Sequence, residues 1–254
     1  MVAMTGRSRL RPLQVKCDDP GPIRFAAVAP PVVLVHGWGG SFESTWQANG
    51  FTELLREAGR TVIGVDLLGH GAAPKPHDPA AYDDLTARVV EASPEGAIDA
   101  IGFSLGAITL LRLAMAQPKR FNKLVLAGVG ESLFATDDSR TRRIIAALEG
   151  HGDPDDNLAR MFVQYASQPG NDILALTAVM KRGRFAVAPE MLSTVTCPTL
   201  VVIGDRDFAG PGQPLVDALP NATLRTLRNV DHFATPESYG FIDAALEFLD
   251  AVPP

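Results

Sequence analysis

Short apolar runs alternate with amphipathic segments along most of the 254-residue chain. Several runs are apolar at nearly every position, such as "PVVLVHG" and "TLVVIGD", which is typical of strands buried on both faces of a sheet. The segments between them have helical spacing, and this alternation predicts a parallel sheet with crossover helices. We therefore predict an α/β fold with a mostly parallel, eight-stranded sheet and helices on both faces.

The expected strands and helices follow from these runs. Strands are expected at residues 14–16, 24–28, 32–36, 61–66, 97–103, 123–127, 200–204 and 223–227. The first two are too close for a crossover helix, so we expect them to form an antiparallel edge. Helices are expected at residues 51–58, 82–92, 105–116, 213–219 and 239–251.

One connection is much longer than a single crossover helix requires. Between residues 127 and 200 the spacing predicts helices at 139–148, 157–167 and 172–181. An inserted helical layer at the carboxyl ends of the strands would lie where open α/β sheets bind ligands. We predict a core of residues 1–130 and 192–254, with a small helical cap, residues 131–191, inserted between the sixth and seventh strands.

Composition narrows the function without defining it. The formal net charge of -6 argues against a nucleic-acid partner, because no global positive field would attract phosphates. Cys17 and Cys197 have no metal-type spacing, and we expect both to be reduced, as in a cytoplasmic protein. We also expect no signal peptide, no membrane span, no metal and no cofactor.

A single serine stands at a sharp turn in "AIDAIGFSLGAITLL", residues 97–111. Ser104 separates the expected strand from the expected helix, and a glycine lies two residues away on either side. So sharp a turn strains the serine backbone, and Gly102 and Gly106 are small enough to avoid a clash. The Ser104 hydroxyl would lie at the helix N-terminus, where negative charge is favoured. A plain helix N-cap would also account for this serine.

The G-x-S-x-G pattern between a strand and a helix resembles the nucleophile elbow of the α/β-hydrolase family. In that family the chain order is nucleophile, acid, histidine. The resemblance implies that Ser104 is the nucleophile and that His232, in the loop before the last helix, is its base. An ordinary surface-loop histidine is the alternative for His232. The other histidines are His36, His70, His77 and His151.

The acid that orients the histidine is expected just after the strand at residues 200–204. "VVIGDRDF" offers Asp205 and Asp207 there. Resemblance to the family's G-x-x-D arrangement favours Asp207, and Asp205 then becomes a turn residue. Glu131, after the preceding strand, is a weaker alternative. The expected catalytic residues are therefore Ser104, Asp207 and His232.

Two backbone N–H groups are expected to form an oxyanion hole. Leu105, which follows the nucleophile, supplies one, and the resemblance assigns the other to Trp38 in "HGWGGS". Gly37 shapes that loop, so Gly37, Gly102 and Gly106 are the structural glycines of the site. The Trp38 side chain is expected to pack under the cap.

A further match lies in "DLLGHGAAP", residues 66–74. It is similar to the family's D-x-x-G-x-G-x-S motif, with Ala73 in place of the usual serine, and we expect His70 to be structural. The resemblance covers residues 24–249 and implies a serine hydrolase of small or medium carboxylic esters. The alternatives are a cofactor-independent perhydrolase, a carbon–carbon bond hydrolase and a ligand-binding module with little turnover. A small-molecule ester is the expected partner, and the chain is expected to be a monomer or a homodimer.

Basic side chains are frequent in the predicted cap. We interpret them as a solvated helix face, although a cationic rim could attract carboxylate or phosphate substrates. They are Arg140, Arg142, Arg143, Arg160, Lys181, Arg182 and Arg184.

Overall fold

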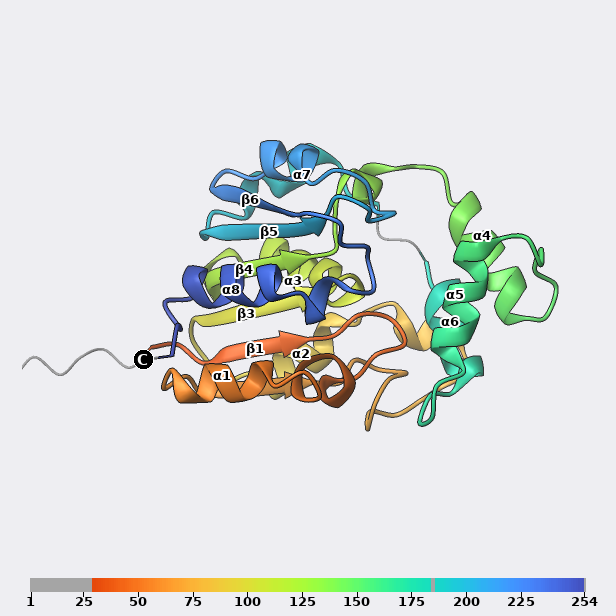
Figure 1. Cartoon of the computed structure of the whole chain (residues 1–254), viewed down its shortest axis with the longest axis horizontal. Coiled ribbons are helices and arrows are strands. Elements are labelled where there is room, and N and C mark those ends of the chain that lie inside the picture. Colours follow the sequence, from red (N-terminus) through yellow and green to blue (C-terminus); the bar gives the residue numbers. More distant parts are fainter. Residues whose placement is uncertain (1–28, 184–185, 254) are drawn as a thin grey trace, which may run out of the picture.

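One parallel sheet forms the centre of the molecule in a computed structural model that describes residues 29–183 and 186–253 (Figure 1). In this part of the chain six strands follow the order β2-β1-β3-β4-β5-β6, and each neighbouring pair is parallel. The strands are β1 (Val32–Val35), β2 (Val62–Val65), β3 (Ile98–Phe103), β4 (Phe121–Ala127), β5 (Thr199–Gly204) and β6 (Ala222–Leu227). Six predicted strands are thus present, and the other two, residues 14–16 and 24–28, lie outside the described residues.

Helices cover both faces of the sheet, as the alternation of apolar runs predicts. One face carries α1 and α8, and the opposite face carries α2, α3 and α7. The helices are α1 (Phe51–Glu57), α2 (Thr86–Ala92), α3 (Leu105–Ala116), α4 (Ser139–Leu148), α5 (Asn157–Ala166), α6 (Ile173–Lys181), α7 (Gln213–Ala218) and α8 (Tyr239–Phe248). Short helical turns span Glu43–Gln47, Pro79–Tyr82, Pro118–Arg120, Glu131–Phe134, Pro189–Thr194 and Thr235–Glu237.

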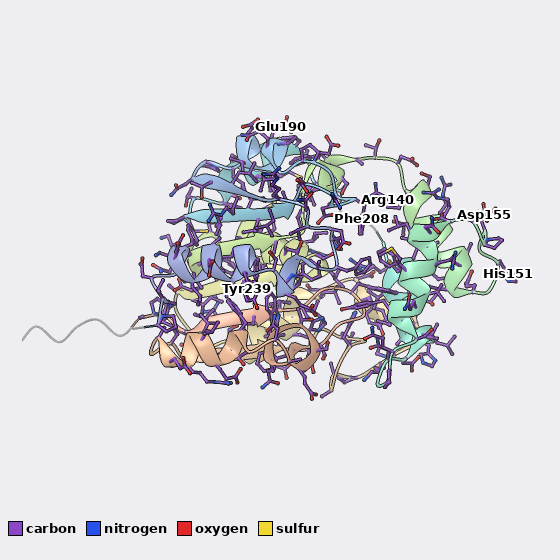
Figure 2. All side chains as sticks on the ribbon, viewed as in Figure 1. Arg140, His151, Asp155, Glu190, Phe208 and Tyr239 are labelled. Carbon is purple, nitrogen blue, oxygen red and sulfur yellow. The ribbon has the colours of Figure 1, made fainter. Side chains whose placement is uncertain are left out.

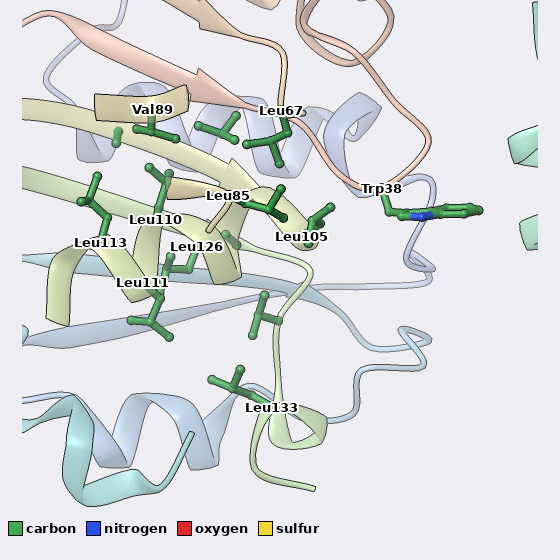
Figure 3. Packing of buried hydrophobic residues seen from close by; sticks show 14 of the residues in the cluster. Trp38, Leu67, Leu85, Val89, Leu105, Leu110, Leu111, Leu113, Leu126 and Leu133 are labelled. Atoms are coloured by element: carbon green, nitrogen blue, oxygen red, sulfur yellow. The ribbon is translucent and has the colours of Figure 1, made fainter. Parts of the chain in front are cut away.

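The alternating side chains of the strands divide the core into two clusters. In β1, Val33 and Val35 pack with the leucines of α3, whereas Val32 and Leu34 pack with the aromatic residues of α1 and α8. Figure 3 shows part of the first cluster, in which Leu110 and Leu126 bring α3 and β4 together. Burial on both faces explains why these strands are apolar throughout.

The helix expected at residues 82–92 begins later than the pattern predicts. Tyr82 ends a short turn that starts at Pro79, and its hydroxyl donates to the carbonyl of Pro76 at 2.5 Å. The Asp84 carboxylate then accepts the backbone N–H of Thr86 at 2.9 Å, and α2 begins at Thr86. Local side-chain bonds therefore interrupt the helical spacing.

The long connection between β4 and β5 contains α4, α5 and α6. Figure 1 places these helices beyond the carboxyl ends of the strands, on the side where the loops after β1, β3 and β5 emerge. Among the described residues, no helix has the length and apolar character needed to cross a membrane.

A buried ion pair fastens the amino ends of the strands. Arg60, just before β2, is hydrogen-bonded to Asp99 of β3, and both side chains are almost completely buried. The same guanidinium donates to the carbonyls of Leu249 at 2.6 Å and Pro30 at 2.8 Å. Asn122 of β4 donates to the other Asp99 oxygen at 2.7 Å. One charged pair therefore joins three strands and the end of α8.

Loss of the Arg60 guanidinium should destabilise the protein strongly, because it leaves the Asp99 carboxylate buried without its counter-charge. We expect Arg60→Met to lower the free energy of unfolding by about 3–5 kcal/mol, measured by urea denaturation. Arg56→Met removes an exposed pair with Glu53 and should cost less than about 1 kcal/mol. Equal losses in the two variants would contradict the role assigned to the buried pair.

Candidate active site

Ser104 lies at the turn between β3 and α3, with no residue between the strand, the serine and the helix. Its backbone has φ 51° and ψ −111°, a left-handed conformation that costs a non-glycine residue energy. A Cβ built on Gly102 would lie 2.6 Å from the nitrogen of Ala107, and one on Gly106 would lie 2.4 Å from the carbonyl oxygen of Val35. The turn therefore needs glycine at both positions, as the sequence pattern predicts.

Three side chains from three loops form one chain of hydrogen bonds. His232 Nε2 lies 2.9 Å from Ser104 Oγ, and His232 Nδ1 lies 2.9 Å from each carboxylate oxygen of Asp207. Asp207 follows β5 and His232 follows β6, so the parallel strands deliver all three residues to the same edge of the sheet. Asp207 and His232 are buried, whereas Ser104 is half-buried. The carboxylate favours a proton on Nδ1, which leaves Nε2 free to accept the serine proton.

The alternative acids lie elsewhere. Asp205 is exposed, and its carboxylate accepts the backbone N–H of Asn229 at 2.8 Å, which is the turn role expected for it. Glu131 is exposed beside Gly210. The structure brings Asp207, and neither of these two, to His232.

The loop after β1 lies directly against the elbow. A Cβ on Gly37 would be 2.8 Å from the ring of Phe103 and 3.4 Å from Ser104 Cβ. The Gly37 carbonyl oxygen accepts from Gly40 N–H at 3.2 Å and lies 2.7 Å from His36 Nδ1. Because a trans peptide holds its C=O and N–H on opposite sides, these bonds also fix the direction of the Trp38 N–H. Leu105 opens α3, so its N–H has no acceptor within the helix.

Two buried histidines, His36 and His70, stabilise the loop after β1. The N–H of Leu67 donates to His36 Nε2 at 3.1 Å, so His36 carries its proton on Nδ1 and donates it to Gly37. The His70 ring lies 5.0 Å from the His36 ring, and its Nδ1 is 2.9 Å from the carbonyl of Leu68. Burial lowers the pKa of His36, and burial together with the neighbouring His36 lowers the pKa of His70 to about 3. Both rings are therefore neutral at pH 7.

Asp66, the first residue of the "DLLGHGAAP" stretch, joins the loops after β1 and β2. One carboxylate oxygen accepts the N–H of Phe42 at 2.7 Å and the other accepts the N–H of Ala72 at 2.8 Å. Gly71 has φ 49°, and a Cβ there would lie 2.2 Å from the same carboxylate. The motif therefore fixes the backbone of these two loops, and these contacts do not involve Ser104.

Aromatic rings surround His232. Phe208 lies 4.2 Å from the imidazole, Phe103 lies 5.0 Å away and Phe233 lies 5.6 Å away, between ring centroids. Phe162 of α5 contacts both Phe208 and Phe233 from the inserted helices. Phe208 and Phe233 were not foreseen as site residues, although each directly follows a member of the hydrogen-bonded set. The surroundings of the histidine are apolar, which strengthens polar interactions by excluding water.

The basic residues of the inserted helices have different environments. Arg142 pairs with Asp138 at 3.1 Å, Arg143 with Asp156 at 3.5 Å, and Lys181 with Glu149, as on a solvated face. Arg140 differs, because its guanidinium lies 5.4 Å from the ring centroid of Phe208. Figure 2 shows Arg140 and Phe208 together between the sheet and the inserted helices. Arg184 lies outside the described residues.

Within residues 29–183 and 186–253, no three histidine, cysteine, aspartate or glutamate side chains form a metal-binding group.

Sequence and structure comparisons find similar hydrolases. The family model described as "Alpha/beta hydrolase family" matches residues 32–245. A 2-hydroxy-6-oxononadienedioate/2-hydroxy-6-oxononatrienedioate hydrolase of Cupriavidus pinatubonensis is 28% identical over 93% of this chain and 90% of its own length. A pimeloyl-[acyl-carrier protein] methyl ester esterase of Methylococcus capsulatus is 30% identical over 80% of this chain and 85% of its own length. The crystal structure of a serine hydrolase involved in carbazole degradation has 26% identity and a TM-score of 0.64, covering 87% of this chain and 91% of that one.

The buried histidines predict loss of stability in mild acid. His70 has its pKa lowered from 6.5 to about 3, and burial also lowers the pKa of His36, so the unfolded chain binds more protons below pH 6.5. The stabilising effect of neutral His70 is complete above that pH and is lost as the pH falls toward 3. Over this range His70 should steepen the decline in unfolding free energy by about 1.4 kcal/mol per pH unit, and His36 acts in the same direction.

We expect His70→Asn, which cannot titrate, to flatten this decline between pH 7 and pH 5 in urea denaturation series. His151 is exposed, so His151→Asn should leave the slope unchanged. A wild-type slope in the His70→Asn protein would contradict the assignment.

Proposed function

The chain belongs to the alpha/beta hydrolase family, and from this we propose that it cleaves small or medium carboxylic esters through an acyl-enzyme intermediate. The observation that carries the proposal is the continuous hydrogen-bonded set of Ser104, His232 and Asp207, with both ends of the imidazole at 2.9 Å. A serine hydroxyl is a poor nucleophile alone, and this arrangement supplies the base and its orienting acid.

The geometry supports acyl transfer in two steps. Ser104 Oγ bonds to the ester carbonyl carbon while its proton passes to His232 Nε2, and the carbonyl electron pair moves to the oxygen. Asp207 stabilises the resulting imidazolium, and the N–H groups of Leu105 and Trp38 hold the oxyanion. The intermediate then expels the alcohol, which takes the proton from His232. Water repeats the sequence, and the acid is released.

We also propose that residues 131–191 act as a cap on a core formed by residues 1–130 and 192–254. The cap residue Phe162 extends the aromatic surroundings of His232 over the site. An apolar cover of this kind suits an uncharged acyl group of modest size, because it excludes water from the reacting carbonyl.

Hydrolysis of a carbon–carbon bond beside a ketone is a second candidate on the same three residues. The relative from C. pinatubonensis is named as a hydrolase of a dicarboxylate of this kind. Arg140 favours this candidate, because it lies over Phe208 without a carboxylate partner among the described residues and is available to an anionic substrate. Hydrogen peroxide in place of water at the release step would instead make the protein a perhydrolase.

Replacing the nucleophile tests the reaction class. We expect Ser104→Ala to lower kcat on p-nitrophenyl acetate or butyrate by more than about 1000-fold, since the attacking oxygen is removed. Wild-type protein, but not the variant, should react covalently with a fluorophosphonate probe. Full activity in Ser104→Ala would overturn the proposal, and a probe-silent wild type that binds esters tightly would indicate a binding module. Faster turnover of a 2-hydroxy-6-oxo dienoate than of any ester would favour the second candidate.

The two aspartates after β5 provide a matched pair. Asp207→Asn should lower kcat about 10,000-fold, because an amide no longer favours the Nδ1-protonated tautomer of His232. Asp205→Asn makes the same change two residues away, at an exposed turn, and should stay within a few-fold of wild type. Steady-state ester hydrolysis by both variants measures the difference, and a reversed order would show that the acid is misassigned.

A further inference from the structure

The loop that carries the Trp38 N–H is held from two sides. On the core side, His36 bonds to the carbonyl of Gly37. On the other side, Asn171, in the turn between α5 and α6, donates its side-chain N–H to the carbonyl oxygen of Gly39 at 2.8 Å. The Trp38 indole N–H donates to the carbonyl of Leu176 in α6 at 3.0 Å. Two hydrogen bonds therefore tie this loop to the inserted helices.

Asn171 is suited to bridge the two layers. Its amide nitrogen carries two hydrogens, and the second is directed to the carbonyl of Tyr165 at the end of α5, at 3.1 Å. Its backbone N–H donates to Gln168 at 3.2 Å, which fixes the turn itself. Asn171 is half-buried and Gly39 is buried, so water competes weakly for their bond.

Apart from the hydrogen bonds to the Gly37 carbonyl, few contacts within the loop hold its shape. Residues Gly37, Gly39 and Gly40 have no side chains to anchor it, and Gly39 has φ 75°. The inserted helices supply that anchor, because a Cβ on Gly39 would lie 2.6 Å from the Tyr165 ring. The Trp38 ring packs on Phe162 at 5.2 Å between centroids. Figure 3 shows it extending away from the labelled leucines of the core.

We propose that Asn171 is a positioning residue, which acts together with the bonds to the Gly37 carbonyl to hold the Trp38 N–H in place for the oxyanion when the α5–α6 turn is seated on the loop. The inference rests on the proposed function. It gives the inserted helices a role in the reaction. A substrate that keeps the α5–α6 turn from contacting the loop is then bound but reacts slowly. Substrate size is then selected through kcat more than through KM.

A nearby contact separates this role from simple attachment of the inserted helices. His77, in the loop after β2, lies 2.9 Å from Asp172, the residue after Asn171. Both side chains are partly exposed. Among the described residues, neither is hydrogen-bonded to the loop that carries Trp38. The His77–Asp172 pair ties the same turn to the core without touching the oxyanion donor, and its removal leaves the bond between Asn171 and Gly39 in place.

Asn171→Ala and the isosteric Asn171→Asp, which cannot donate, test the proposal in the full-length protein. We expect kcat on p-nitrophenyl butyrate to fall about 10- to 100-fold with KM within twofold, because the N–H donor is displaced. Affinity for a trifluoromethyl ketone, whose adduct with Ser104 carries an oxyanion, should fall in parallel with kcat/KM. Asn157→Ala, at the exposed start of α5, and His77→Ala should keep kcat within twofold.

The possible results separate a positioning role of Asn171 from an ordinary structural role and from failure of the proposed function. A higher KM with unchanged kcat, or an equal loss of kcat in His77→Ala, would overturn the proposal and leave Asn171 as an ordinary anchor. If Asn171→Ala does not fold, as judged by its melting temperature, Trp38→Phe removes the other tie and should give the same loss of kcat. Wild-type protein that neither hydrolyses esters nor reacts with a fluorophosphonate would overturn the proposed function, whereas active wild type with an unaffected Asn171→Ala overturns only this inference.

Discussion

The close packing of α3 against β1 is the constraint on which the rest of the site depends. Gly106 lies so near the β1 backbone that a Cβ would be 2.4 Å from the carbonyl oxygen of Val35. The helix therefore starts immediately after β3, and Ser104 takes the strained conformation between them. Strain of this kind costs about 1–3 kcal/mol, and the buried sheet provides the stability that maintains it. A looser connection would relax the serine and move its hydroxyl away from His232.

Around Ser104, hydrogen bonds hold the neighbouring loops in place. Asp66 joins the loops after β1 and β2, and the neutral His36 orients the Gly37 carbonyl beside Ser104. His36 and Gly37 are buried, where a hydrogen bond is stronger and a missing partner is costly. The loops at the carboxyl edge can therefore carry precise geometry, although loops are usually the most mobile parts of a fold.

Sequence alone predicted the elements that depend on local pattern. The bounds of α3 and α4 agree with the predicted 105–116 and 139–148. The start of α2 was misplaced, because the bonds of the Asp84 carboxylate to Thr86 and of the Tyr82 hydroxyl to Pro76 override the spacing. The contacts of Phe208 and Phe233 with His232 depend on how the loops after β5 and β6 approach each other, and no short pattern encodes that approach.

The contact between Asn171 and Gly39 could not be predicted from the sequence, because it depends on how the fold packs together. The two residues are 132 positions apart, and an asparagine before a helix reads as an ordinary turn residue. Only the seating of α5 and α6 beyond the strands gives its amide a carbonyl in the glycine loop. The meeting of Ser104, His232 and Asp207 could thus be expected from the core alone, because parallel strands deliver their loops to one edge. The shape of the loop that carries Trp38 depends on both layers. Under the proposed function, a change in the inserted helices would therefore alter reactivity without altering Ser104, His232 or Asp207.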